Sequence, residues 1–284
     1  MSSIKTKTIN GVIWSAIDSF STQAIGFLVS IILARLLSPG EFGLIGMITI
    51  FIAISQSFID SGFSSALIRK KNCTETDYST VFYFNLTVGI LFYLILFFSG
   101  PLISYFFKET QLTNLVRVLS LILIINSLTI IQRTILTKRI DFKLQSKISI
   151  ISALASGIIG IGMAYFGFGV WSLVFQTLSR QVFNSSLLWL WNRWRPMWIF
   201  SIQSFKELFS FGSKLLISGL IYTVYRNIYY LVIGKFFSAS QLGYYTRAQQ
   251  FNDLPSSNLN SIMSRVTYPV LAQMQDDPVK LKAG

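Results

Sequence analysis

The stretch Ile32–Gly46, ILARLLSPGEFGLIG, has a second copy in this chain, because residues 232–246, two hundred positions later, read VIGKFFSASQLGYYT. Ser38 is matched by Ser238, and both copies keep a glycine five residues further on. Each copy is a short polar turn between two long apolar runs. Internal repeats of this size are typical of membrane transporters. The pattern therefore predicts a chain built from large related parts.

The composition excludes an ordinary soluble protein. Of the 284 residues, 52% are hydrophobic and only 12% are charged, whereas soluble domains carry about 25% charged residues. The net charge is +13, which is typical either of nucleic-acid binding or of basic loops beside a membrane. Cys73 is the only cysteine and histidine is absent, so we expect neither a disulfide framework nor a metal site, and no cofactor.

Seven or eight apolar runs are long enough to cross a membrane as helices, which takes about 20 residues. We therefore predict an all-α, polytopic membrane helix bundle of about eight spans. The glycines of Gly167-Phe168-Gly169 would allow a tight turn between the fifth and sixth spans. The predicted spans are 10–34, 42–67, 79–107, 113–132, 148–166, 169–191, 209–234 and, more weakly, 242–272.

The basic residues are unevenly divided between the two sides of this topology. The loops on the side of the N-terminus (1–9, 66–79, 132–147 and 192–208) carry 13 Lys or Arg residues, and the opposite loops carry only Lys108. Because cytoplasmic loops are rich in Lys and Arg, we expect the N-terminus to be cytoplasmic. The basic loops would face anionic membrane lipids, so no nucleic-acid partner is needed to explain the charge.

Two segments outside the spans have interfacial character. In 133–147, cations alternate with apolar residues, so this segment could lie along the membrane surface or form a solvated loop. The segment 189–207 holds four of the six tryptophans and is predicted to be an interfacial anchor. Since Pro196 interrupts any helix there and the repeat restarts afterwards, 189–207 is interpreted as a link between two lobes.

We divide the chain into an N-terminal six-helix lobe, 1–204, and the start of a C-terminal lobe, 205–284. An even number of helices per lobe would relate the lobes by an axis along the membrane normal. The second lobe then contains only two helices. We expect a fragment or truncated product of a protein of at least twelve spans, or a natural eight-helix protein that oligomerises.

Arg180 and Arg226 are the strongest candidates for binding an anionic substrate. Each lies roughly nine to eleven residues from the nearest turn, near the bilayer middle at about 1.5 Å per residue. Guanidinium groups suit phosphate oxygens, and Tyr225 and Asn227 beside Arg226 could contact sugars. The alternative is a salt bridge with Asp18 or Asp253 that only fastens helices together.

Asp18 and Asp253 are also candidates for coupling transport to a proton or sodium ion, because a carboxylate within a span is usually functional. We interpret Asp60 as a structural partner of Arg69 or of a neighbouring helix end. Five further cations lie near helix ends and are expected to anchor at the interface: Arg117, Lys235, Arg247, Lys214 and Arg265. The chain contains no ATPase loop and no HExxH or GxSxG motif, so we predict no enzyme.

With these residues in view, the chain resembles the polysaccharide exporter branch of the multidrug/oligosaccharidyl-lipid/polysaccharide flippase superfamily. The resemblance implies two six-helix bundles around a cavity, alternating access, and an undecaprenyl-diphosphate-linked oligosaccharide as substrate. It also implies a role in surface polysaccharide biosynthesis (O-antigen, capsule or exopolysaccharide), with a glycan polymerase as a partner. The stretches that carry it are LARLLSPGEFGLIGMITIF (33–51), FIDSGFSSALIRKKN (58–72), LTKRIDFKLQSKISI (136–150), GFGVWSLVFQ (167–176) and LGYYTRAQQFNDLP (242–255).

Three functions remain open at this point. The first is a flippase whose midplane arginines hold the diphosphate. The second is a cation-coupled multidrug or small-molecule antiporter of the same architecture, which should show unpaired carboxylates facing its cavity instead. The third, a glycan polymerase, would need a large loop with catalytic residues, which the sequence lacks.

Overall fold

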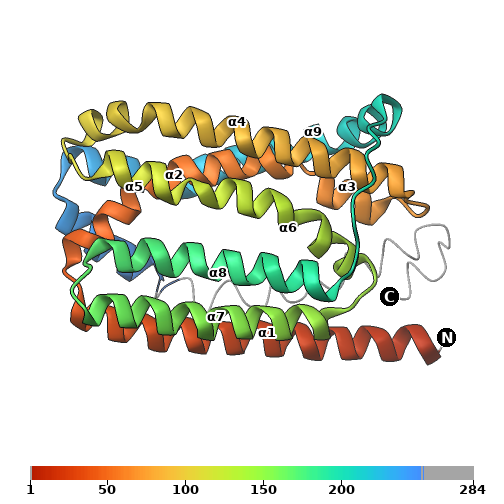
Figure 1. Cartoon of the computed structure of the whole chain (residues 1–284), viewed down its shortest axis with the longest axis horizontal. Coiled ribbons are helices and arrows are strands. Elements are labelled where there is room, and N and C mark those ends of the chain that lie inside the picture. Colours follow the sequence, from red (N-terminus) through yellow and green to blue (C-terminus); the bar gives the residue numbers. More distant parts are fainter. Residues whose placement is uncertain (1, 251, 253–284) are drawn as a thin grey trace.

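The computed structural model describes residues 2–250 and 252, and within them the chain is helical without any strand. This confirms the predicted all-α fold (Figure 1). Residues 239–250 form a further helix, called helix 239–250 below. The other helices are α1 (Ser2–Leu36), α2 (Pro39–Asp60), α3 (Phe63–Arg69), α4 (Glu75–Phe107), α5 (Leu112–Leu119), α6 (Leu121–Lys138), α7 (Phe142–Tyr165), α8 (Val170–Trp191) and α9 (Ile202–Phe236).

Six helical segments of the described part are long and apolar enough to cross a membrane, which makes the chain a multi-pass membrane protein. The predicted span 169–191 forms α8 but is not one of the six. Its polar side chains lower its mean hydropathy, and one of them, Asn184, accepts a hydrogen bond from Arg133 of α6 at 3.1 Å. Most of the predicted eighth span lies outside the described residues.

The turns follow from their residue types. The Gly167-Phe168-Gly169 turn is confirmed, since Gly167 and Gly169 have φ angles of 79° and 55°, which favour glycine. The predicted span 42–67 is interrupted at Ser61 and Gly62, both in the left-handed region, and is divided into α2 and α3. Thr74 caps α4 by accepting a hydrogen bond from the backbone N–H of Asp77.

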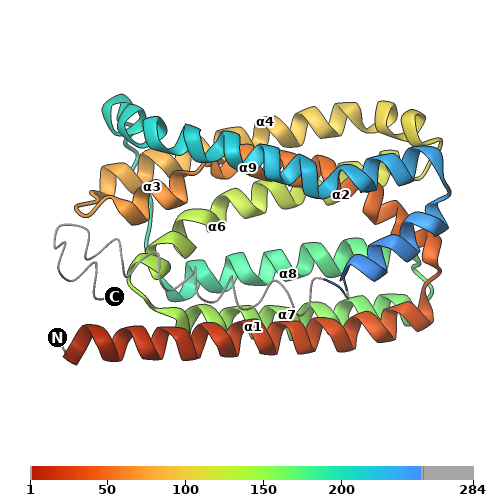
Figure 2. The same cartoon turned by 180° about the vertical axis from the view of Figure 1, so that it is seen from behind.

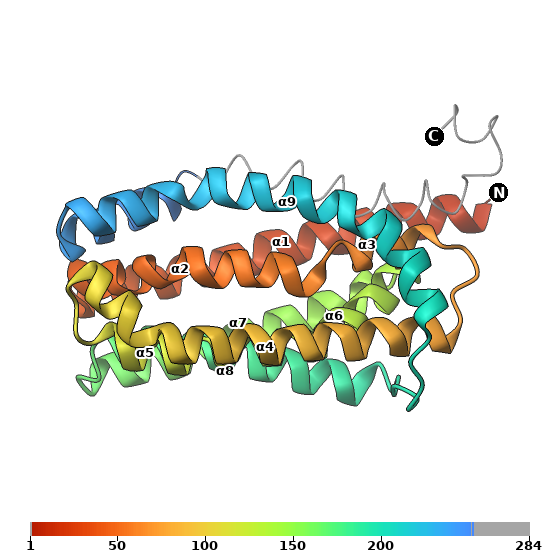
Figure 3. The same ribbon diagram turned by 90° about the horizontal axis from the view of Figure 1, so that it is seen from above.

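The long helices run side by side, and their connections gather at two ends of the bundle (Figures 1 and 2). One end holds the turns after α1, α4, α7 and α9, and we call it the hairpin end. The other holds the N-terminus, α3 and the connection from α8 to α9, and we call it the basic end. In one part of the bundle α7 packs between α1 and α8, and in the other α9 lies along α2 (Figure 3).

The two repeated hairpins meet at the hairpin end. A Cβ added to Gly43 would lie 1.8 Å from the carbonyl oxygen of Ala239, and one added to Gly243 would lie 1.8 Å from that of Pro39. Positions 43 and 243, and 39 and 239, correspond in the repeat, so the contact is reciprocal, as in an arrangement about a two-fold axis. Helix 239–250 can approach α2 this closely only because both helices carry glycine here.

The two copies also begin their second helices in the same way. The backbone N–H of Ser38 donates to Glu41 Oε2 at 2.6 Å, and that of Ser238 donates to Gln241 Oε1 at 3.2 Å. In the second copy the backbone N–H of Gln241 donates back to Ser238 Oγ at 3.2 Å. The two copies of the repeat therefore share the N-terminal cap of α2 and of helix 239–250, in addition to their similar sequences.

The prediction of an interfacial segment over 133–147 is wrong. The segment is the end of α6, a tight turn in which Ile140 has a φ of 60°, and the start of α7. Its apolar side chains face the protein rather than lipid, since Ile135, Leu136 and Phe142 are at most 3% exposed. The same spacing of apolar residues fits a helix face that packs on the protein core and one that lies in lipid, so the sequence pattern does not distinguish the two.

The tryptophan-rich link is a strap of irregular backbone from 192 to 201 that crosses the basic end (Figure 1). Its tryptophans are not all interfacial anchors as predicted. Trp194 is 8% exposed and donates from its indole nitrogen to Glu75 Oε2 at 2.8 Å, whereas Trp198 is 93% exposed. The strap is fastened to α4, because the backbone N–H groups of Met197 and Ser201 donate to Ser79 and Thr80.

Candidate substrate-binding site

Arg180 lines a cavity of about 200 Å³ between α1, α8 and helix 239–250. Its side chain is accessible rather than enclosed by other side chains. The other described residues of the lining are uncharged and offer hydroxyl and amide groups from Thr22, Gln23, Ser30 and Gln250, with Gly26 and Phe27. Such a wall presents one positive charge among neutral hydrogen-bonding groups, which suits an anion.

Asp18 lies on α1 and is 5% exposed, and its charge interacts with that of Arg180 on α8. The structure thus brings together one arginine candidate and one carboxylate candidate named from the sequence. The carboxylate does not line the cavity; Arg180 does. Asp18 therefore offsets part of the charge of Arg180 from a buried position outside the cavity lining.

Arg226 lines a different cavity, of about 230 Å³, with Asn227 and Tyr230 of α9 and Gln249. Asn227 donates to the Thr223 carbonyl at 2.8 Å. Gln249 and Gln250 are adjacent, so helix 239–250 contributes to both cavities, and it lies between α9 and α1 (Figure 2). The sequence interpretation placed both arginines on one central cavity, whereas in the structure they line two.

One of the remaining candidates, Tyr225, lines neither cavity. It is 76% exposed and projects from α9 in a different direction from Asn227 and Tyr230. Asp253 lies outside the described residues, as does Arg265.

Arg247 has a role that the sequence interpretation missed. Its Nη1 donates to Ser30 Oγ at 2.7 Å, and its guanidinium lies over the Phe42 ring at 3.5 Å. Instead of anchoring at the membrane surface, it ties helix 239–250 to α1 and α2. The sequence signal for this role was Gly243, one helical turn before Arg247. A glycine lets its helix pack closely against a neighbour, so a long side chain on the same face contacts that neighbour rather than the membrane surface.

Two other predicted anchors also bind protein groups at the hairpin end. Lys235 donates to the Phe106 carbonyl at 2.7 Å, and Arg117 donates to the Phe97 carbonyl at 3.3 Å. Both cations also lie over the ring of the residue that accepts the bond, at 4.1 and 4.7 Å. They fasten α9 and α5 to α4.

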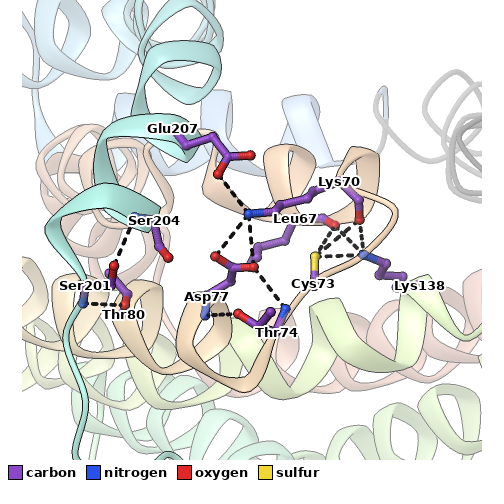
Figure 4. A network of polar contacts seen from close by, with 10 residues as sticks. All are labelled: Leu67, Lys70, Cys73, Thr74, Asp77, Thr80, Lys138, Ser201, Ser204 and Glu207. Atoms are coloured by element: carbon purple, nitrogen blue, oxygen red, sulfur yellow. Dashed lines mark hydrogen bonds and ion pairs between the residues drawn. The ribbon is translucent and has the colours of Figure 1, made fainter.

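The basic end holds a network of polar contacts between α3, α4 and α9 (Figure 4). Lys70 Nζ lies 2.9 Å from Glu207 Oε2 and 3.1 Å from Asp77 Oδ2. Partial burial lowers the pKa of Lys70, but its hydrogen bonds to Glu207 and Asp77 outweigh this effect and raise the pKa above its ordinary value. Lys70 therefore stays charged at neutral pH.

Lys138 completes the network by donating to the Leu67 carbonyl and to Cys73 Sγ, both at 2.8 Å.

Asp60 accepts from Ser64 Oγ at 2.5 Å, so its partner is the neighbouring helix rather than Arg69. Arg69 instead lies over the Phe211 ring of α9 at 4.5 Å. Among the described residues, no group of three or more acidic, Cys or His side chains could hold a metal ion.

A comparison with protein families identifies the family of this chain. Residues 32–284 match the model of a family described as polysaccharide biosynthesis protein. The chain belongs to the polysaccharide biosynthesis protein family. This membership confirms the resemblance found in the sequence.

Members of the polysaccharide biosynthesis protein family that are similar to this chain come from several bacteria. The teichuronic acid biosynthesis protein TuaB of Bacillus subtilis (strain 168) is 31% identical over 290 residues, covering 100% of this chain and 59% of TuaB. The lipopolysaccharide biosynthesis protein WzxC of Escherichia coli (strain K12) is 27% identical, over 99% of this chain and 58% of WzxC. The succinoglycan biosynthesis transport protein ExoT of Rhizobium meliloti (strain 1021) is also 27% identical, over 96% and 55%. The chain thus spans less than three-fifths of these relatives.

The fold of this family member is that of MATE transporters. A MATE structure in complex with MaD3S superposes with a TM-score of 0.71 at 17% identity, covering 99% of this chain and 68% of that one. The structure of the MATE multidrug transporter DinF-BH gives a TM-score of 0.69 at 13% identity, covering 93% and 65%. At such low identity the likeness concerns the fold alone.

Proposed function

We propose that this chain forms part of a flippase that moves an undecaprenyl-diphosphate-linked oligosaccharide across the cytoplasmic membrane by alternating access. The observation that carries the proposal is the lining of the two cavities. Among the residues that the structure describes, each cavity holds one arginine with hydroxyl and amide groups, and no carboxylate lines either one. Arg180 and Arg226 would bind the diphosphate, and Asn227 would contact the sugar. Tyr225 would contact the substrate only after a movement of α9, because it lines neither cavity.

The rival function is a cation-coupled multidrug antiporter. A site for organic cations is expected to present carboxylates to the ligand. Asp18 is buried behind Arg180 and so offers no such surface. The names of TuaB, WzxC and ExoT refer to polysaccharide biosynthesis or transport, which also favours the flippase. Asp18 and Asp253 keep the proposed role of ion coupling.

The proposal places the basic end in the cytoplasm of a bacterial cell, with the protein in the inner membrane and the N-terminus inside. The support is the excess of Lys and Arg in the loops of that end. We keep the division into a first lobe, 1–204, and the start of a second, 205–284. The chain would act as a transporter rather than an enzyme, beside a glycan polymerase that consumes the translocated substrate.

Glycan export by bacteria that depend on the complete gene containing this chain tests the proposal. We expect Arg226→Ala and Arg180→Ala to lower export at least about tenfold, since each removes a charge-assisted contact of about 1.5–3 kcal/mol. Arg226→Lys should restore export partly, because Lys keeps the charge but not the fork of donors. Arg35→Ala is the matched control, since Arg35 lies outside both cavities. Full export by both Ala variants at normal protein levels would sink the proposal.

A further inference from the structure

A third cavity, of about 360 Å³, opens at the basic end between α3 and the first turns of α9. One wall is cationic and carries the consecutive residues Arg69, Lys70 and Lys71. The other wall belongs to α9 and carries Glu207, Leu208 and Phe211. The cavity is therefore bounded by both proposed lobes.

The two walls are held close to each other by backbone packing and by stacking. A Cβ added to Gly212 of α9 would lie 2.7 Å from the carbonyl oxygen of Ser61. Beside this contact, the Arg69 guanidinium lies over the Phe211 ring at 4.5 Å. Stacking restrains the plane of a group that carries five N–H donors, which is the geometry that recognises phosphate oxygens.

Lys70 contacts two carboxylates of very different character. Asp77 is 1% exposed in its side chain and is held by the backbone N–H of Thr74 at 2.9 Å, as part of the cap of α4 (Figure 4). Glu207 is 59% exposed in its side chain and approaches from α9. Because exposed ion pairs are weak, Glu207 can be replaced at Lys70, whereas Asp77 is fixed.

We propose that this cavity binds the phosphate group of a membrane lipid, and that the phosphate takes the place of Glu207 beside Lys70. A phosphate group brings more negative charge and more acceptor oxygens than one carboxylate, so it competes well for Lys70 and reaches the neighbouring cations at the same time. The cavity lies at the end of the bundle where basic loops meet anionic lipid headgroups.

The identity of the lipid rests on the proposed function. If the chain is part of a flippase, the diphosphate of the lipid-linked oligosaccharide is the ligand, and the cavity is a loading site at the cytoplasmic surface. Displacing Glu207 would then break an ion pair between the two lobes, so that arrival of substrate loosens the basic end. A phosphatidic acid headgroup offers the same chemistry and is the other source of the phosphate.

The test measures binding of radiolabelled undecaprenyl diphosphate to the full-length protein in phosphatidylcholine nanodiscs. We expect Lys70→Gln to weaken binding about tenfold and Glu207→Gln to strengthen it several-fold, because the first removes a partner and the second removes a competitor. The matched controls are Lys206→Gln, next to Glu207 in the chain, and Glu109→Gln at the hairpin end; neither lines the cavity, and both should bind as the wild type does.

The opposite signs separate a binding site from a purely structural ion pair. If Lys70 and Glu207 only join helices, both variants lower the melting temperature and change binding in the same direction, which would overturn the proposal. Unchanged or weaker binding by a Glu207→Gln protein with a normal melting temperature would overturn it too. Lys70→Arg should keep both binding and stability, since the charge remains.

Competition identifies the source of the phosphate. Displacement by undecaprenyl diphosphate but not by phosphatidic acid assigns the site to the substrate, and equal displacement by both assigns it to lipid phosphates in general. Displacement by inorganic pyrophosphate alone would overturn a lipid site. Failure of the export test with the Arg180 and Arg226 variants leaves these binding measurements intact, so the two proposals can fail separately.

Discussion

Gly43 of α2 packs against the carbonyl of Ala239 so closely that a Cβ on Gly43 would lie 1.8 Å from that oxygen. The contact joins the two copies of a repeated hairpin, and Gly243 makes the equivalent contact with Pro39. In alternating access, a transporter opens one end while the other is closed. At the hairpin end of this structure, two backbones are in direct contact.

We expect Gly43→Ala and Gly243→Ala each to push the hairpins apart, because the added Cβ meets backbone that cannot rotate away. The cost should be about 1–3 kcal/mol in stability, measured as a lower melting temperature of the purified protein. Gly26→Ala and Gly219→Ala are matched controls, since a Cβ at either position meets no atom of the described residues within 4 Å. Equal melting temperatures for all four variants would show that the hairpin contact is not close in the membrane.

A second prediction concerns the bond between Arg247 and Ser30, which ties helix 239–250 to α1 at 2.7 Å. Arg247→Ala should destabilise the protein by about 1.5–3 kcal/mol, the usual value of a hydrogen bond to a charged group. Arg247→Lys should recover only part of this, because Lys lacks the flat face that lies over Phe42.

Ser30→Ala completes a double-mutant cycle for this bond. If the bond exists as described, the double mutant loses less stability than the sum of the two single losses. Ser19→Ala is a suitable comparison, since the Ser19 hydroxyl belongs to the same helix without contacting Arg247. Additive losses for Arg247→Ala and Ser30→Ala would contradict the direct contact.

These contacts show how far sequence reasoning reaches in this protein. Most of the spans and the turn at Gly167 follow from hydropathy and glycine conformation, both of which act locally. Arg247 was misjudged because its position along the helix gives its depth but not the helix that it faces. Trp194 was misjudged because a protein carboxylate, that of Glu75, accepts from the indole N–H as well as water at an interface does.

The same limit explains why the two arginines were expected in one cavity. Depth places Arg180 and Arg226 at similar levels, but only the packing of helix 239–250 between α9 and α1 assigns them to separate cavities. The Lys70 network had no signal in the sequence at all, because Asp77 and Glu207 lie 7 and 137 residues from Lys70.

A third prediction tests the electrostatic relation between Asp18 and Arg180. Asp18→Asn leaves the charge of Arg180 without its balance, so we expect a loss of stability that Arg180→Gln partly reverses in the double mutant. The coupling energy should be about 0.5–3 kcal/mol. Asp18→Asn combined with Arg35→Gln is the control and should be additive.

Asp18→Asn also distinguishes the two roles named for this carboxylate. As a structural counter-charge, it should alter stability while export keeps its dependence on the proton or sodium gradient. As an ion-coupling site, it should remove that dependence in an export assay with imposed gradients. The dependence of export on the gradient is measured separately from the melting temperature, so a change in stability does not obscure it.

A fourth prediction concerns the strap at the basic end, where the Trp194 indole donates to Glu75 at 2.8 Å and is 8% exposed. Trp194→Phe keeps an aromatic ring but removes this hydrogen bond. Because Glu75 is exposed and water can replace the indole donor, we expect a loss of about 0.5–1.5 kcal/mol. Trp198→Phe makes the same chemical change at a ring that is 93% exposed, and it should alter stability by less than about 0.5 kcal/mol. Thermal unfolding of both variants in detergent gives the comparison. Since the strap connects α8 to α9, equal effects of the two substitutions would mean that lipid, rather than the protein, holds it in place.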